Sequence, residues 1–228
     1  MFLLLSVDLQ LCSDGTRQPK MGSRMGKIGK LLKVMSRPGL VRMALSNAVR
    51  MADGDSIACA IGGLTDAEIA ALVRWLPDAG TFVEFGTLFG FTAKAIAAAK
   101  PNLKIVAVDN FCWNPFGLPP KLHEDFTRRI LANEIAAGRI EVVNTTSEEF
   151  RASCKTPPDA VFFDAQHQYE PVRDEIAWAK RAGVKCICGH DYGNPSPVFG
   201  VTRAVDEEFP KGVDVVGMCW RGVGGLDV

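Results

Sequence analysis

The sequence predicts an α/β fold built on a doubly wound, mostly parallel sheet. Short apolar runs alternate with stretches of helical spacing from about residue 61 to the end. Two of these runs, 104–109 and 159–164, are continuously apolar, which is typical of strands covered on both faces in a parallel sheet. The last apolar runs are broken by glycine and leave no room for a helix between them. We therefore expect a seven-stranded Rossmann-like sheet that closes with a C-terminal antiparallel hairpin.

The expected elements follow from local signals along the chain. Thr65, with Glu68 three residues later, predicts a helix start, and Pro77 predicts its end just after Leu76. The expected strands cover 81–86, 104–109, 140–144, 159–164, 184–189, 213–218 and 222–228. The expected helices between them cover 92–99, about 122–137, 147–153 and 169–182. A chain of 228 residues with this pattern is expected to form one domain with its own core over 61–228.

The segment 1–60 is expected to be a basic extension that is partly disordered or helical. No acidic residue occurs from Gly15 to Ala52, whereas lysine and arginine recur there. Four apolar residues fall at helical spacing beside those charges, namely Met25, Ile28, Leu32 and Met35. Such a helix would cover the domain or a partner subunit, or it would bind an acidic surface. The apolar run at 1–5 is too short to span a bilayer, so no membrane span is expected.

Charge and cysteine content narrow the class of protein. Lysine and arginine together number 26, as do aspartate and glutamate, so the formal net charge is zero. The chain as a whole therefore gives no electrostatic reason to expect nucleic-acid or membrane binding. The seven cysteines are scattered and include no Cys-x-x-Cys pair of the zinc type, which predicts a reduced, cytoplasmic protein.

The segment 82–92 is the most informative stretch of the chain. It reads as an apolar strand that carries Glu84 near its carboxyl end, then a turn with Gly86 and Gly90, then a helix that opens on Thr92. Glycines at such a turn let the backbone approach a ligand, and the free N–H groups of a helix start favour an anionic group. A carboxylate beside them suits a hydroxyl or a cation. The expected ligand therefore has an anionic end and a cationic or hydroxylated part.

Acidic residues also end the next strands. Asp109 follows the second strand, where a carboxylate can accept hydrogen bonds from two vicinal ribose hydroxyls, although a helix cap is the alternative. After the third strand, Thr146 and Ser147 could cap the helix that follows and could also contact an adenine edge.

A second cluster of polar residues follows the fourth and fifth strands. Asp164, His190 and Asp191 are expected to converge, because neighbouring parallel strands end at the same edge of a sheet. Two carboxylates and an imidazole suit a divalent metal, and His167 lies on the same side. In the alternative, the two acids only cap loops or pair with Arg173 or Arg203.

The spacing of these residues resembles that of a known family. The pattern runs Glu84-x-Gly86-x-x-x-Gly90-x-Thr92, Asp109, Asp164-x-x-His167-x-Tyr169 and Gly189-His190-Asp191-Tyr192. It is similar to that of the class I S-adenosylmethionine-dependent methyltransferases. Within them it looks most like the metal-dependent O-methyltransferases of the macrocin O-methyltransferase-like group. The resemblance covers about 60–228, so 61–228 is expected to be the methyltransferase domain.

The resemblance implies a role for each matching residue. Glu84, Gly86, Gly90 and Thr92 would hold the methionine end of S-adenosylmethionine, and Asp109 would hold the ribose. Asn110 and Phe111 would flank the adenosine, and Thr146 and Ser147 would lie near the adenine. Thr87 and Asp164 complete the expected donor-binding set. Asp164, His190 and Asp191 would bind a divalent cation, expected to be magnesium, and His167 would be the general base.

One departure concerns the metal. Relatives often have two consecutive acids where this chain has His190 and Asp191, and an imidazole there favours manganese, iron or zinc over magnesium.

The expected activity is O-methylation of a small hydroxylated acceptor. The aromatic and proline-rich loop 111–120 either covers that acceptor or is a rigid surface connection. A nicotinamide dehydrogenase is disfavoured, because the glycines lack the Gly-x-Gly-x-x-Gly spacing. Two further alternatives are an accessory subunit of a hydroxylation complex and a nucleic-acid methyltransferase recruited through the basic segment. The absence of an Asn/Asp-Pro-Pro-Tyr-like motif after the fourth strand argues against base methylation, and a homo-oligomer is compatible with the sequence.

Overall fold

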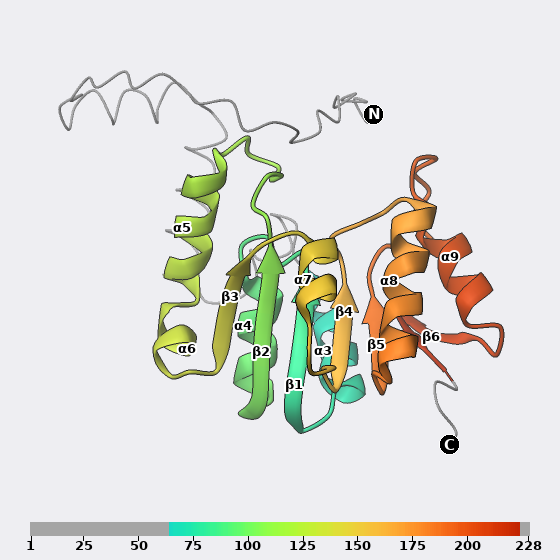
Figure 1. Ribbon diagram of the computed structural model, residues 1–228, viewed down its shortest axis with the longest axis horizontal. Coiled ribbons are helices and arrows are strands. Elements are labelled where there is room, and N and C mark those ends of the chain that lie inside the picture. The colour runs from blue at the N-terminus through green and yellow to red at the C-terminus, as the bar shows by residue number, and fades with distance from the viewer. Residues whose placement is uncertain (1–63, 224–228) are drawn as a thin grey trace.

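The computed structural model describes residues 64–223, so the extension expected over 1–60 lies outside the described residues. The described part alternates helices and strands (Figure 1). Its helices are α3 (Asp66–Trp75), α4 (Phe91–Ala99), α5 (Pro120–Ile130), α6 (Ala132–Ala136), α7 (Ser147–Ser153), α8 (Tyr169–Ala182) and α9 (Val201–Glu208). Its strands are β1 (Ala79–Phe85), β2 (Asn102–Asp109), β3 (Ile140–Asn144), β4 (Ala160–Phe163), β5 (Cys186–Gly189), β6 (Val213–Val216) and β7 (Cys219–Gly222).

The strands form one seven-stranded sheet in the order β3-β2-β1-β4-β5-β7-β6. The pairs from β3 to β5 are parallel, whereas β7 runs antiparallel to both β5 and β6. The chain therefore moves outward from β1 through β2 to β3 and then crosses back to β4. This reversal between β1 and β4 creates the crevice where open α/β sheets bind ligands. The predicted fold class is confirmed.

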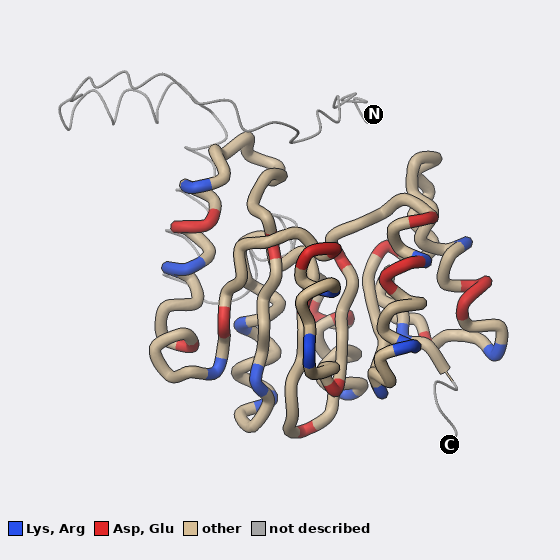
Figure 2. Tube along the Cα trace, viewed as in Figure 1, with Lys and Arg blue, Asp and Glu red and all other residues tan. Residues whose placement is uncertain are grey.

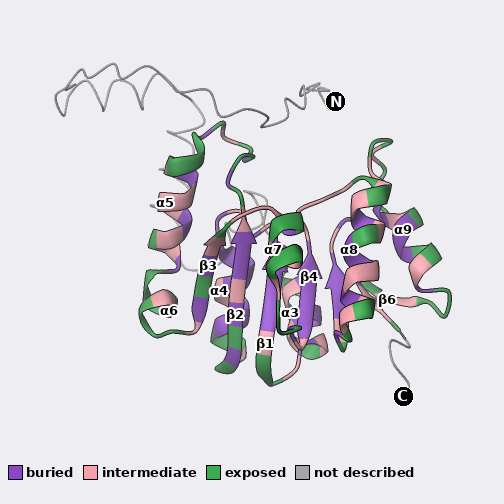
Figure 3. Cartoon of the chain, viewed as in Figure 1, coloured by how far each residue is buried: buried purple, intermediate pink, exposed green. Residues whose placement is uncertain are grey.

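Helices cover both faces of the sheet, which explains the unbroken apolar strands. Leu72 of α3 and Ile96 of α4 pack with Phe82 on one face. Ile176 of α8 and Val205 of α9 pack with other strand residues on the opposite face. Figure 3 shows the same division, with buried strands between helices that are exposed on their outer sides. Burial on both faces removes the alternation of polar and apolar residues that a half-exposed strand would show.

Three elements differ from the prediction. The helix expected over 122–137 is divided into α5 and α6 at Leu131, whose side chain is fully buried. Helix α9 was not predicted; it follows β5 along the chain and packs against α8. The last described strand, β7, lies before the one expected at 222–228, because the chain reverses after Val216 through Gly217 at a φ of 61°; residues 224–228 lie outside the described part.

The surface of the described part carries charges of both signs. Acidic and basic residues alternate along α5, where Lys121 pairs with Asp125 and Arg128 pairs with Glu124 (Figure 2). From residue 64 to residue 223, no helix combines the length and the apolar character needed to cross a bilayer.

Candidate active site

The loop after β1 depends on glycine at two positions. Gly86 has a φ of 85°, and a Cβ there would lie 2.3 Å from the carbonyl oxygen of Asp164. Gly90 has a φ of 80°, and a Cβ there would lie 2.7 Å from the side chain of Leu131. Both positions combine a left-handed backbone with a close approach, which only glycine tolerates without strain. The loop 86–90 thus lies tightly between β4 and the end of α5.

Glu84 and Thr87 form a buried pair at the start of this loop. The Thr87 hydroxyl donates a hydrogen bond to the Glu84 carboxylate, and both side chains are buried. Burial raises the pKa of Glu84 to about 7, which the Thr87 hydrogen bond opposes. Thr92 is also buried, in the first turn of α4. The predicted contacts for the methionine end therefore lie together, and the acid among them is partly protonated near neutral pH.

Asp109 connects the loop that follows β1 to the loop that follows β2. One of its oxygens accepts from the backbone N–H of Leu88 at 2.8 Å, and the other accepts from that of Phe111 at 2.7 Å. Burial raises the pKa of Asp109 despite these hydrogen bonds. A carboxylate has about four lone-pair positions, so two remain for ligand hydroxyls.

The two residues after Asp109 differ in their surroundings. Asn110 is exposed, and its side-chain oxygen accepts from the backbone N–H of Cys112. The ring of Phe111 is fully buried and lies edge-on to His123 at 5.1 Å. The ring packs in the core, and the position of Phe111 beside an adenosine stays a prediction.

Thr146 and Ser147 both make internal hydrogen bonds. Thr146 caps α7 and forms a capping box with Glu149, as the capping interpretation expects. Ser147 is buried, and its hydroxyl donates to the Glu175 carboxylate on α8. Neither contact tests the predicted position near an adenine.

The predicted metal and base residues converge at the ends of β4 and β5. Nε2 of His167 lies 3.0 Å from Oδ2 of Asp191. Candidate ligand atoms of Asp164, His167 and Asp191 all lie within 4.8 Å of one another. The ring of His167 also stacks on Phe199 with a centroid distance of 4.5 Å, which fixes the plane of the imidazole.

His190 lies among three acidic residues. Its Nδ1 is 3.7 Å from Asp164 and 3.8 Å from Asp191, and its Nε2 is 3.4 Å from Glu68. Glu68 is buried and also accepts from the backbone N–H of Met218 at 2.8 Å. The sequence identified Glu68 only as a capping residue, and no local signal marks its contact with His190.

The acids at this edge repel one another. The pKa of Asp164 is raised well above its usual range, first by burial and then by the charges of Asp191, Glu84, Glu68 and Asp109. Burial alone would also raise the pKa of Asp191, but hydrogen bonds from His167 and Asn194 hold it below its ordinary value. The edge therefore gathers acidic groups that suppress one another's ionisation, and a cation bound there would favour their charged forms.

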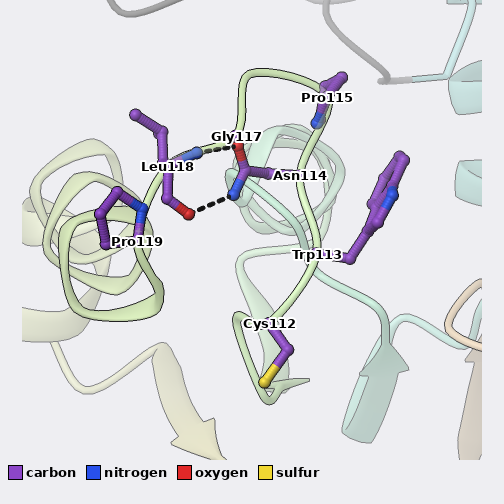
Figure 4. Close-up of a pocket in the computed structure, with 7 residues that line it drawn as sticks. All are labelled: Cys112, Trp113, Asn114, Pro115, Gly117, Leu118 and Pro119. Atoms are coloured by element: carbon purple, nitrogen blue, oxygen red, sulfur yellow. Dashed lines mark hydrogen bonds between the residues drawn. The ribbon is translucent and has the colours of Figure 1, made fainter. Parts of the chain in front are cut away.

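The loop after β2 forms a pocket of about 440 Å³. Asn114 organises this loop from inside, because its amide donates to the carbonyl of Leu118 and its oxygen accepts from the backbone N–H of Leu118 (Figure 4). The same oxygen also accepts from the backbone N–H of Phe116. Trp113 is 65% exposed and extends away from these hydrogen bonds. The pocket is lined by Cys112, Trp113, Asn114, Pro115, Gly117, Leu118 and Pro119.

The segment that carries this site matches a known family model. Residues 83–192, which contain the glycine loop and the clustered acids, match the family model described as a methyltransferase domain. The chain resembles the class I S-adenosylmethionine-dependent methyltransferases. No curated protein sequence matches the chain.

Solved structures share the fold of the described part of the chain. A protein from Klebsiella pneumoniae assigned as an O-methyltransferase is 18% identical, with a TM-score of 0.52 over 79% of this chain and 96% of that chain. The cofactor-bound Rv0187 from MTB is 24% identical, with a TM-score of 0.51 over 81% of this chain and 87% of that chain. An O-methyltransferase family protein from Burkholderia thailandensis is 15% identical, with a TM-score of 0.50 over 82% and 59% of the two chains. At these identities the likeness establishes the fold alone.

Proposed function

We propose that this protein transfers the methyl group of S-adenosylmethionine to a hydroxyl of a small molecule. The acceptor oxygen forms a bond to the methyl carbon while the bond from that carbon to sulfur breaks. The bonding electrons pass to the sulfur, which becomes the neutral thioether of S-adenosylhomocysteine, and the hydroxyl proton goes to a base. Because this displacement needs oxygen, carbon and sulfur in line, the main contribution of the protein is positioning.

The observation that carries the proposal is the convergence of acids at adjacent strand ends. Glu84, Asp109 and Asp164 lie near the carboxyl ends of β1, β2 and β4, which are neighbours in the sheet. The donor brings a sulfonium, an ammonium and two ribose hydroxyls, and each of these groups is favoured by a nearby carboxylate. Together with the family match, this arrangement supports donor binding at the reversal between β1 and β4.

His167 suits the role of general base. With Nε2–H donating to Asp191, the imidazole is held in the tautomer that leaves Nδ1 free to accept a proton. Asp191 would also stabilise the imidazolium that forms. This acid–imidazole pair is the arrangement that orients a base in many transfer enzymes.

The same residues also fit a divalent cation. The clustered atoms of Asp164, His167 and Asp191 offer two carboxylates and a nitrogen, a mixed set that suits manganese, iron or zinc better than magnesium. Asp164 and Asp191 would hold the ion, with His190 or His167 as the third ligand. When bound, such an ion would lower the pKa of an acceptor hydroxyl. If His167 is that third ligand it cannot also be the base, so its two roles exclude each other.

The acceptor would lie against the loop 111–119. This loop follows β2 at the same edge as Asp109, and it presents an exposed Trp113 on a backbone held by Asn114. A rigid aromatic wall favours an acceptor with an apolar or sugar ring.

Calorimetry tests the proposal directly. The wild-type protein is titrated with S-adenosylhomocysteine, alone and with manganese or magnesium, and Asp109→Ala provides the matched variant. We expect saturable binding that Asp109→Ala weakens at least tenfold, because the two ribose hydroxyls lose their acceptor. Absence of binding by the wild type would overturn the proposed donor. Retained binding with no methyl transfer to any hydroxylated acceptor would favour an accessory role instead.

A further inference from the structure

Two residues beside the candidate donor site hold a backbone conformation that is rare for side chains other than glycine. Leu88 in the glycine loop has a φ of 49°, and Phe111 after β2 has a φ of 57°. This left-handed region is unfavourable for a residue with a Cβ, so the surrounding structure has to hold it.

The same two side chains hold both residues. The carboxylate of Asp109 accepts from the backbone N–H groups of Leu88 and Phe111. The imidazole of His123, which is fully buried on α5, faces their carbonyl oxygens. Its Nε2 lies 3.0 Å from the oxygen of Leu88, and its Nδ1 lies 3.4 Å from that of Phe111. The Thr127 hydroxyl donates a further hydrogen bond to Leu88 at 2.7 Å.

Packing joins the two loops at the same place. The ring of Phe89 lies 4.7 Å from that of His123 and 5.7 Å from that of Phe116. Phe89 also forms a buried cluster with Leu118 of the second loop. A structural change in one loop is therefore transmitted to the other through these packing contacts.

We propose that His123 is a positioning residue that couples the donor loop, 86–90, to the acceptor loop, 111–119. The proposal deepens the proposed function and rests on it, because it takes these loops as donor and acceptor walls. A neutral imidazole has one N–H and can donate to only one of the two carbonyl oxygens at a time. When the donor itself holds the loop 86–90, the ring is free to donate to Phe111, so donor binding orders the acceptor loop.

The charge state of the ring agrees with this scheme. Burial lowers the pKa of His123, although the nearby charge of Asp109 opposes that effect. The neutral form of the imidazole is therefore favoured at neutral pH. The two carbonyl oxygens then compete for its single N–H.

A matched pair of variants separates the two hydrogen bonds without any ligand. In His123→Gln the side-chain amide reaches the position of Nε2, whereas in His123→Asn it reaches that of Nδ1. Because the ligand-free ring donates to Leu88, amide hydrogen exchange in 86–90 should quicken about tenfold for His123→Asn, whereas His123→Gln should leave both loops near the wild-type rate. Equal acceleration of the loop 86–90 by both variants, or by neither, would overturn the proposal.

A third variant keeps the test decisive if the histidine variants do not fold. Thr127→Val has nearly the same shape as the wild type and removes only the hydroxyl that donates to Leu88. It should quicken exchange in 86–90 and leave 111–119 unchanged. Acceleration of the acceptor loop alone would contradict the assigned roles.

The coupling itself is measured with S-adenosylhomocysteine as the probe. In the wild type, binding should slow exchange in 111–119 and change the fluorescence of Trp113, with Trp113→Phe showing which part of the signal is its own. His123→Gln should bind within about threefold of the wild type but lose the protection of 111–119. Equal protection in both proteins would overturn the coupling. Failure of the wild type to bind at all would instead overturn the proposed function, and the ligand-free exchange pattern would still test how His123 holds the loop 86–90.

Discussion

His167 and Asp191 show how single residues acquire a role from their neighbours. The hydrogen bond between them selects a tautomer of the imidazole, and Phe199 fixes the plane of its ring. An isolated histidine would have neither constraint. The pair is therefore a better candidate for proton transfer than either residue would be alone.

Replacing His167 should affect the rate more than donor binding. We expect His167→Ala to lower kcat by about 10²–10⁴-fold while the Kd of S-adenosylhomocysteine stays within a few-fold of the wild-type value. His167→Gln is the matched control, because its amide can still donate to Asp191 but cannot act as a base at neutral pH. Stopped-time methyl-transfer assays and calorimetry measure the two quantities. Undiminished kcat in both variants would exclude His167 as the base.

At the scale of secondary-structure elements, a buried carboxyl group joins α7 to α8. Glu175 is completely buried, accepts from the hydroxyl of Ser147, and has no hydrogen-bond partner for its other oxygen. Burial raises its pKa to about 7, despite that hydrogen bond and the charges of Arg151 and His167. The two helices are therefore packed around an acid that is protonated in the folded protein and ionised in the unfolded one at mildly acidic pH.

Replacing Glu175 with glutamine should flatten the pH dependence of stability. Because the folded pKa is raised, the favourable contribution is present at low pH and is lost as the pH rises from about 4.5 to about 7. Relative to the wild type, Glu175→Gln should gain roughly 2–3 kcal/mol of unfolding free energy between pH 5 and pH 8. Urea denaturation at several pH values measures this difference. Glu84 titrates in both proteins, so its effect cancels, and parallel pH curves would contradict the assignment.

For the whole molecule, the candidate ligand site lies between loops that belong to different halves of the sheet. The glycine loop follows β1, the second loop follows β2, and the Asp164 cluster follows β4 and β5. A donor that contacts all of them would stabilise only the folded chain. Its binding energy would then add to the free energy of unfolding.

Ligand should therefore raise the melting temperature of the whole domain. At a concentration of S-adenosylhomocysteine about 100 times its Kd, the expected gain is about 2.7 kcal/mol, or roughly 5–10 °C for a chain of this size. Differential scanning calorimetry measures the shift, and adenosine alone serves as the control for partial contacts. A melting temperature that does not respond to the ligand would contradict a donor site that spans these loops.

Much of the fold and part of the site could be predicted from the sequence, because the signals are local. Apolar runs marked the parallel strands, and their carboxyl ends identified Glu84, Asp109 and Asp164 before any contact was known. In a parallel sheet those ends share one edge, so position along the chain was enough to bring the acids together. The division of α5 from α6 and the presence of α9 were missed, since both depend on packing against distant elements.

What only the tertiary structure decided is which side chains face one another. Glu68 meets His190 across 122 residues of sequence, and His123 meets Leu88 across 35. The buried ring of Phe111 meets His123 in the same way. Periodicity and turn chemistry report the neighbours of a residue along the chain, whereas these contacts arise from side chains brought together by the crossing of separate strands and helices.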